Sequence, residues 1–192
     1  MSQARDRLLR TATELFYAEG IHAVGVDRVI AVAQVTRATL YRHFASKDDL
    51  VVAYLTAADE AIRARTAAAR AKDAPPEDIV REIGQHIADD IQGQGFRGCA
   101  FLNAAAEYPD PAHPVHQAVL KHRQWFLDTV TELLAATGET DPDAAARHFV
   151  MLRDGAMAAG CLTDPKPIGE TFLLGVEGLL HSRNGRRPPA KR

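Results

Sequence analysis

The chain has 192 residues and a formal net charge of −2 at pH 7, with 23 Lys and Arg against 25 Asp and Glu. This balance excludes a uniformly basic protein, although a nucleic-acid-binding protein can carry its cations on one face only. Frequent alanine and the absence of long β-branched runs favour an all-α fold, and 46% hydrophobic residues suffice for a sizeable core.

The first predicted helix spans residues 4–19. Leu8, Ala12 and Phe16 recur at helical spacing and form its apolar side, and Gly20 is placed to end the helix. We expect this apolar side to pack on the elements that follow and to complete a three-helix core.

Residues 25–50 predict two short helices joined by a tight turn, with a third helix directly after them. Val29 and Ala33 lie on one apolar face of the first helix, and Leu40 and Phe44 form the buried side of the second. Such a helix-turn-helix commonly inserts the N-terminal half of its second helix into the DNA major groove.

Two hydroxyl residues predict where the second and third of these helices begin. Thr36 is a plausible N-cap for the second, because its hydroxyl can accept from a free backbone N–H two or three residues on. Ser46 is placed to cap the third, and Asp48 and Asp49 follow in its first turn, where the helix dipole favours negative charge.

The outward side of this stretch is rich in hydrogen-bond donors. No acidic residue lies between Arg28 and Lys47. A helical hairpin with an ordinary solvated face is the alternative to a DNA-binding surface. The residues that we predict to contact DNA are Gly25, Arg28, Thr36, Arg37, Ala38, Thr39, Tyr41, Arg42, His43 and Lys47.

A combination of residues makes this stretch specific: Gly20, Val29, Ile30, Ala33, Val35, Thr36, Thr39, Leu40, Tyr41, Phe44, Ser46, Lys47 and Leu50. Together they resemble the DNA-binding domain of the TetR (tetracycline-repressor) family of bacterial transcription regulators. Two positions depart from the family pattern. Gln34 stands in the turn where glycine is usual, and a left-handed backbone there costs glutamine about 1 kcal/mol more than glycine. Gly25 stands where the helix often begins with Thr or Ser, which leaves a backbone N–H contact to phosphate.

The resemblance implies a ligand-responsive homodimer, most often a repressor, that a small-molecule effector releases from a palindromic operator in double-stranded DNA. We accordingly divide the chain into a DNA-binding domain over residues 1–47 and a regulatory and dimerisation domain over residues 48–182. The basic tail, residues 183–192, is predicted to be disordered.

Proline and glycine mark the boundaries of the remaining predicted helices, which span residues 47–72, 76–91, 99–108, 114–136, 142–162 and 167–182. Glycines recur inside the last two, where each costs about 1 kcal/mol relative to alanine. Close packing within one chain could explain them. The resemblance implies instead a two-fold bundle built from the last two helices of each chain. The predicted interface residues are Gly155, Ala159, Gly160, Phe172, Gly175, Val176 and Leu179.

Polar side chains interrupt the apolar stripes of the C-terminal helices. Each one alone is more often a satisfied polar group of the core, but together they match an apolar cavity with a few hydrogen-bonding groups. The resemblance also implies such a cavity. The predicted ligand-binding residues are His86, Asn103, Ala106, Glu107, His122, Trp125, Phe126, Phe149, Arg153 and Met157.

No motif has the spacing of a catalytic or metal site, so we expect neither an enzyme nor a cofactor. Cys99 and Cys161 lie in apolar stretches without a partner cysteine nearby, and we expect both to be buried thiols. The polar N-terminus and the lack of a long apolar run predict a cytoplasmic protein that binds no membrane. Two alternatives stay open, an effector-independent DNA-binding dimer and an enzyme that uses the C-terminal helical interior.

Overall fold

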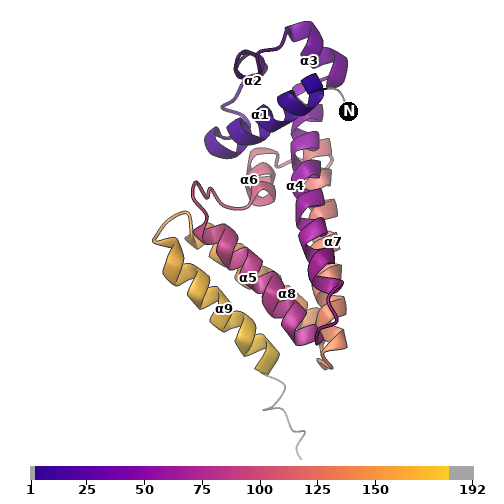
Figure 1. Cartoon of the computed structure of the whole chain (residues 1–192), viewed down its shortest axis with the longest axis vertical. Coiled ribbons are helices and arrows are strands. Elements are labelled where there is room, and N and C mark those ends of the chain that lie inside the picture. Colours follow the sequence, from indigo (N-terminus) through magenta and orange to yellow (C-terminus); the bar gives the residue numbers. More distant parts are fainter. Residues whose placement is uncertain (1–2, 182–192) are drawn as a thin grey trace, which may run out of the picture. The chain divides into compact units, whose positions relative to one another are not determined.

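The computed structural model describes residues 3–181 (Figure 1). These residues form nine helices and no strand, which confirms the all-helical prediction. The predicted basic tail, residues 183–192, lies outside the described residues. The helices are α1 (Gln3–Glu19), α2 (Val26–Ala33), α3 (Arg37–His43), α4 (Lys47–Arg70), α5 (Pro76–Gln92), α6 (Ala100–Glu107), α7 (Pro114–Ala136), α8 (Pro142–Ala159) and α9 (Pro165–His181).

The chain divides into two compact units. Unit 1 consists of residues 3–63 and Cys99–Arg123, and unit 2 consists of Ala64–Gly98 and residues 124–181. Helices α4 and α7 contribute to both, since each begins in unit 1 and ends in unit 2. These units are defined by packing, so the functional boundary that we place after residue 47 stays a prediction.

In unit 1, α1 packs against α2 and α3. Leu8, Val29 and Leu40, one from each helix, are completely buried and form the predicted three-helix core. Gly20 ends α1 with a left-handed backbone (φ 96°), and its N–H donates to the Phe16 carbonyl at 3.1 Å. The apolar spacing seen in the sequence therefore corresponds to the observed packing.

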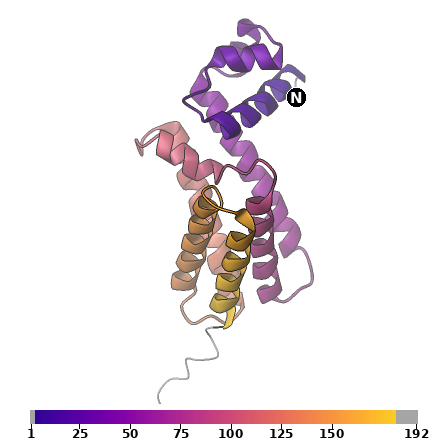
Figure 2. The ribbon, with the colours of Figure 1, turned by 90° about the vertical axis from the view of Figure 1, so that its left-hand side faces the viewer.

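In unit 2, α9 lies beside α5 and α8 (Figure 2). The Phe149 ring is central, because its centroid lies 6.3 Å from that of Phe126 and 5.9 Å from that of Phe172. Glycines bring the helices close together: a Cβ added to Gly160 would lie 2.7 Å from Ile91. Aromatic rings thus fill the interior of unit 2, and glycine allows its helices to pack closely.

Helix α8 ends at Ala159, a little before the predicted end near Leu162, and Leu162 is 82% exposed. The next helix begins at Pro165, where the Asp164 carboxylate accepts from the Lys166 N–H at 3.1 Å. Cys161 lies in this connection and is exposed, so the expectation of a buried thiol is wrong for it, whereas Cys99 is buried. The turn after α8 lies at the surface. The apolar neighbours of Cys161 in the sequence do not indicate this exposure.

The predicted interface residues of α9 occupy the inner side of that helix. Phe172, Val176 and Leu179 are buried within their own chain in unit 2, so their role at a subunit interface stays a prediction. Gly160 and Gly175 also serve packing within the chain, because a Cβ on them would meet Ile91 and Leu152, respectively. Of the other two interface candidates, Gly155 is exposed and Ala159 is half-buried.

Candidate nucleic-acid interface

Gln34 forms the turn between α2 and α3 with a left-handed backbone (φ 51°, ψ 51°). Its N–H donates to the Ala31 carbonyl at 3.3 Å, and the Val35 N–H donates to the Ile30 carbonyl at 3.2 Å. Among the described residues, Gln34 is the only one other than glycine with a positive φ. The turn thus takes the conformation that glycine adopts most readily, with glutamine in its place.

The two predicted N-caps are confirmed. The Thr36 hydroxyl accepts from the Thr39 N–H at 3.1 Å at the start of α3, and it also shares a hydrogen bond of 2.9 Å with the Thr39 hydroxyl. The Ser46 hydroxyl accepts from the Asp49 N–H at 3.0 Å at the start of α4. Because these caps satisfy otherwise free N–H groups, they fix where α3 and α4 begin.

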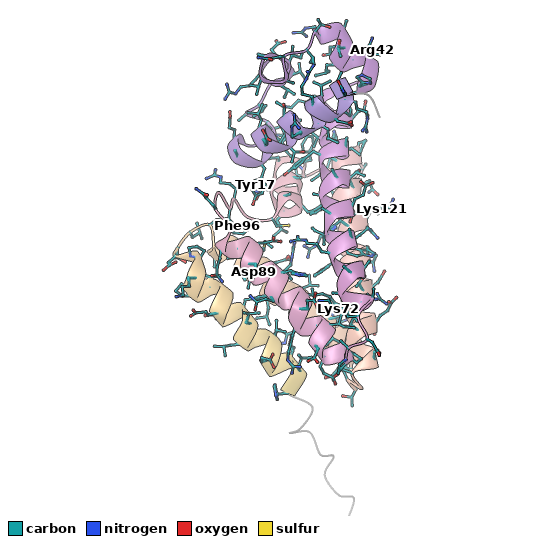
Figure 3. All side chains as sticks on the ribbon, in the orientation of Figure 1. Tyr17, Arg42, Lys72, Asp89, Phe96 and Lys121 are labelled. Carbon is teal, nitrogen blue, oxygen red and sulfur yellow. The ribbon has the colours of Figure 1, made fainter. Side chains whose placement is uncertain are left out.

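The predicted DNA-contacting residues all lie at the surface, and none is buried. On α3, Leu40 is buried and Tyr41 is exposed. Arg42 is also exposed (Figure 3). The other exposed members of the set are Gly25, Arg28, Thr36, Arg37 and Ala38, and the half-buried members are Thr39, His43 and Lys47. The structure therefore brings one polar face together on α2, α3 and the start of α4.

Two of the arginines on this face have acidic partners that the sequence pattern did not reveal. Arg28 donates two hydrogen bonds to Glu19, at 2.8 and 3.3 Å, and this bonding raises the pKa of Arg28. Arg37 is ion-paired with Asp27. Both acids precede Arg28 in the chain and so lie outside the acid-free stretch from Arg28 to Lys47.

Arg42 and Lys47 differ from these arginines. Within residues 3–181, neither side chain has an ion pair. Lys47 is the first residue of α4, where free backbone N–H groups and the helix dipole also favour an anion. These two cations can therefore bind phosphate or base edges without first leaving an acidic partner in this part of the chain.

Elsewhere in unit 1, two predicted ligand-binding residues already have partners. The Glu107 carboxylate accepts from the backbone N–H groups of Ile21 and His22, at 2.9 and 2.5 Å. His122 is buried, stacks on Phe101 with ring centroids 3.6 Å apart, and lies 2.7 Å from the Asp59 carboxylate through its Nδ1. Both side chains thus hold parts of unit 1 together.

The residues that follow α6 also bind the start of α4. The Tyr108 hydroxyl donates to the Asp48 carboxylate at 3.1 Å, and His113 Nε2 lies 3.3 Å from the other Asp48 oxygen. The Val115 N–H donates to His113 Nδ1 at 3.2 Å, which leaves the ring proton of neutral His113 on Nε2, facing Asp48. Burial and, next, the hydrogen bond to Asp48 raise the pKa of Tyr108.

The predicted ligand-binding residues do not all lie in one unit. Asn103, Ala106, Glu107 and His122 belong to unit 1, and His86, Trp125, Phe126, Phe149, Arg153 and Met157 belong to unit 2. In unit 2, Arg153 is buried, its guanidinium carbon lies 5.6 Å from the centre of the Phe126 ring, and it donates to Asp154 at 2.8 Å. Of the unit 2 members, Phe126, Phe149, Arg153 and Met157 are therefore buried together, whereas His86 and Trp125 are half-buried.

Unit 2 also has an open groove of about 390 Å³ that we did not predict, because its lining is made of ordinary surface residues of α7 and α8. They are Gln124, Leu127, Asp128, Thr131, Glu132, Asp143 and Arg147. None of the predicted ligand-binding residues lines this groove. In the part of the chain that the structure describes, no three His, Cys, Asp or Glu side chains are placed to hold a metal ion. Over the same residues, no helix has the length and hydropathy needed to span a membrane.

Comparison with known proteins gives a family. Residues 8–54 match the model of the bacterial regulatory proteins of the tetR family. The chain is 67% identical to SCO4454, a TetR-family transcriptional regulator from Streptomyces coelicolor, and the two structures agree with a TM-score of 0.91. That alignment covers 93% of this chain and 95% of SCO4454.

Two further relatives match over a part of their length only. The chain is 38% identical to the HTH-type transcriptional regulator TcmR of Streptomyces glaucescens over 64 residues, which are 33% of this chain and 28% of TcmR. It is 28% identical to the HTH-type transcriptional regulator YjdC of Escherichia coli over 74 residues, which are 38% of this chain and 39% of YjdC. The match over nearly the whole of SCO4454 is what decides the family: the chain belongs to the TetR family of bacterial transcriptional regulators.

Proposed function

We propose that the protein is a cytoplasmic, homodimeric repressor that binds a palindromic operator through α3 and releases it when a small molecule binds. DNA binding is supported above all by Arg42 and Lys47, two cations without an ion pair in residues 3–181, on a helix-turn-helix with satisfied caps. Phosphate contacts fix the position of such a protein on DNA, and contacts to base edges give it sequence specificity. We assign Lys47 and Tyr41 to phosphate and Arg37, Thr39 and Arg42 to the bases.

Operator binding measured with single variants tests this assignment. Lys47→Ala should weaken binding to all sequences alike and lower the slope of log affinity against log salt by about 1, because one phosphate fewer is neutralised. Arg42→Ala should cost about 1–3 kcal/mol at particular base pairs. Lys121→Ala, which removes the same charge from an exposed position on α7 (Figure 3), is the control. Equal losses on operator and random DNA for both test variants would refute the division between phosphate and base contacts.

Dimerisation is supported by exposed apolar side chains next to open glycines on α8 and on α9. Met151 and Leu174 are each 72% exposed, and nothing lies within 4 Å of a Cβ added to Gly155 or Gly178. Met151 and Gly155 are four residues apart on α8, as are Leu174 and Gly178 on α9, so each pair lies on one helix face. Small residues beside large apolar ones allow the helices of a second copy to approach closely.

An aspartate at this face tests the dimer, because a second copy would bury its charge in an apolar contact. Met151→Asp should be monomeric by sedimentation at micromolar concentration and should bind a palindrome at least about tenfold more weakly. Leu120→Asp, at a half-exposed position of α7, is the matched control. Two recognition helices of a dimer should lie about 34–36 Å apart, or a multiple of that distance. A monomeric wild type with full operator affinity would contradict the dimer.

The ligand response is supported by the interior of unit 2, where the buried Arg153 lies over the Phe126 ring and donates to Asp154. We propose a small, largely apolar ligand with one acceptor group for this cation. Coupling of about 1–3 kcal/mol would weaken DNA binding by roughly 5- to 150-fold. Compounds that raise the melting temperature of the wild type should release operator, and Arg153→Met should abolish both effects. Hits that leave operator affinity unchanged would favour an effector-independent dimer, and turnover of a hit would favour an enzyme.

A further inference from the structure

An exposed ion pair joins the first two helices of the helix-turn-helix. Asp27 lies in the first turn of α2, and Arg37, its partner, is the first residue of α3. The Arg37 side chain is 57% exposed and that of Asp27 is 76% exposed. A pair so open to solvent contributes little to stability, and buried Val29 and Leu40 already hold the two helices in the core. The pair therefore adds little to the packing that already holds the two helices together.

The pair engages one nitrogen of the Arg37 guanidinium. A guanidinium carries five N–H donors in a rigid fork, and Asp27 engages Arg37 through Nη2. Within residues 3–181, no other partner of Arg37 is found, so most of the fork remains open to solvent. Such an arginine can still donate two hydrogen bonds to the O6 and N7 atoms of a guanine.

We propose that Asp27 is a specificity-determining positioning residue: it orients Arg37 toward a base edge and withholds it from phosphate. The proposal rests on the DNA-binding function proposed above. On the operator, Arg37 keeps its pair with Asp27 and donates to the base with its remaining N–H groups. On random DNA, Arg37 gains only a phosphate, and the nearby Asp27 carboxylate offsets the charge of Arg37 and repels that phosphate.

The negative charge of Asp27 should lower the affinity for random DNA more than the affinity for the operator. Sequence-independent binding comes almost entirely from cations that neutralise phosphates. An Arg37 held by Asp27 is one such cation fewer, and the Asp27 carboxylate itself repels the phosphates. The structure thus contains an acidic residue on the DNA-binding face that lowers affinity for the wrong sites more than for the right one.

The test compares binding to an operator selected by the wild type from random duplexes with binding to a random duplex of the same length. Asp27→Asn keeps the shape of the side chain and removes its charge. It should strengthen binding to random DNA by about three- to tenfold and steepen the salt slope by about 1, because Arg37 becomes available to phosphate. Operator affinity should change less, so the ratio of the two affinities should fall. Selection with Asp27→Asn should also lose the preference for one base pair.

Two controls separate positioning from net charge. Asp27→Glu keeps the carboxylate and should restore the affinity ratio. Glu60→Gln removes one exposed negative charge from α4, 13 residues after Lys47, and should leave the ratio unchanged. An unchanged ratio and an unchanged base preference in Asp27→Asn would overturn the inference, as would an equal gain on both duplexes. A wild type that shows no preference for any sequence would instead refute the proposed function itself.

Discussion

Unit 1 and unit 2 both have an apolar core, but the carboxylate contacts between distant segments are more buried in unit 1 than in unit 2, where Arg81 pairs with Glu177 and Arg65 pairs with Asp90. In unit 1, carboxylates connect distant segments: Glu107 accepts from the backbone of Ile21 and His22, and Asp59 meets His122. In unit 2, aromatic rings pack around Phe149, and glycines allow close approach of α5, α8 and α9. Hydrogen-bonded carboxylates depend on charge and direction, whereas apolar packing depends on volume. Loss of a carboxylate in unit 1 should therefore cost more stability than loss of an exposed one in unit 2, where loss of core volume should have the larger effect.

The largest effect should follow from removing volume in unit 2. Phe149→Ala should lower the free energy of unfolding by about 3–5 kcal/mol, because it removes a completely buried ring and leaves a cavity. Phe149→Leu retains most of the volume and should cost clearly less. Urea denaturation measures both variants. Equal losses would show that volume does not control this unit.

The next effect should follow from neutralising a carboxylate in unit 1. Glu107→Gln replaces one acceptor oxygen with a donor amide that faces a backbone N–H, and we expect a loss of about 1–3 kcal/mol. Hydrogen exchange at the Ile21 and His22 amides should become faster. Glu132→Gln in unit 2 breaks only an exposed pair with Arg70 and should cost less than about 1 kcal/mol. A smaller loss of unfolding free energy for Glu107→Gln than for Glu132→Gln would show that carboxylates do not matter more in unit 1 than in unit 2.

A smaller effect should be seen in the pH dependence of stability. Burial raises the pKa of Asp59, but hydrogen bonds from His122 and Arg63 and their charges outweigh burial, so the pKa is lowered. Because the pKa of Asp59 is lower in the folded chain, the unfolded chain takes up the Asp59 proton at a higher pH as the solution is acidified. The contribution of Asp59 is therefore present above its ordinary pKa, near pH 4, and is lost as the pH falls through its folded pKa.

Denaturation of the wild type and of Asp59→Asn between about pH 2 and pH 6 measures this contribution. The wild type should lose stability more steeply on acidification below about pH 4 than the variant does. Parallel curves for the two proteins would mean that the ion pair with His122 and Arg63 does not stabilise unit 1.

The smallest effect should come from the turn of the helix-turn-helix, where neither charge nor volume is concerned. Gln34→Gly should stabilise the protein by about 1 kcal/mol or less, because glycine adopts the left-handed backbone at lower cost. Gln34→Ala shares the strain of glutamine and should give no such gain. Thermal denaturation of the three proteins is the measurement, and a lower melting temperature for Gln34→Gly would contradict the strain.

The sequence by itself determined the helices and the helix-turn-helix. Apolar residues recur at helical spacing within each helix, as at Leu8, Val29 and Leu40. The capping residues Thr36 and Ser46 lie directly before the helices that they cap. These features depend on residues within one or two turns of each other. Local physics therefore sufficed to predict the all-α fold and the polar face of α3, and the resemblance to the TetR family used the same local residues.

Only the tertiary structure decided which segment each helix face contacts. Periodicity shows that α9 has an apolar side, but it does not show that Phe172 and Val176 are enclosed by their own chain while Leu174 stays exposed. The partners of Glu107 lie 86 and 85 residues away, and Asp59 lies 63 residues from His122. Pairings at this separation exist only once the helices have packed, because helical spacing specifies the direction of a side chain around its own helix and not the segment that it will contact.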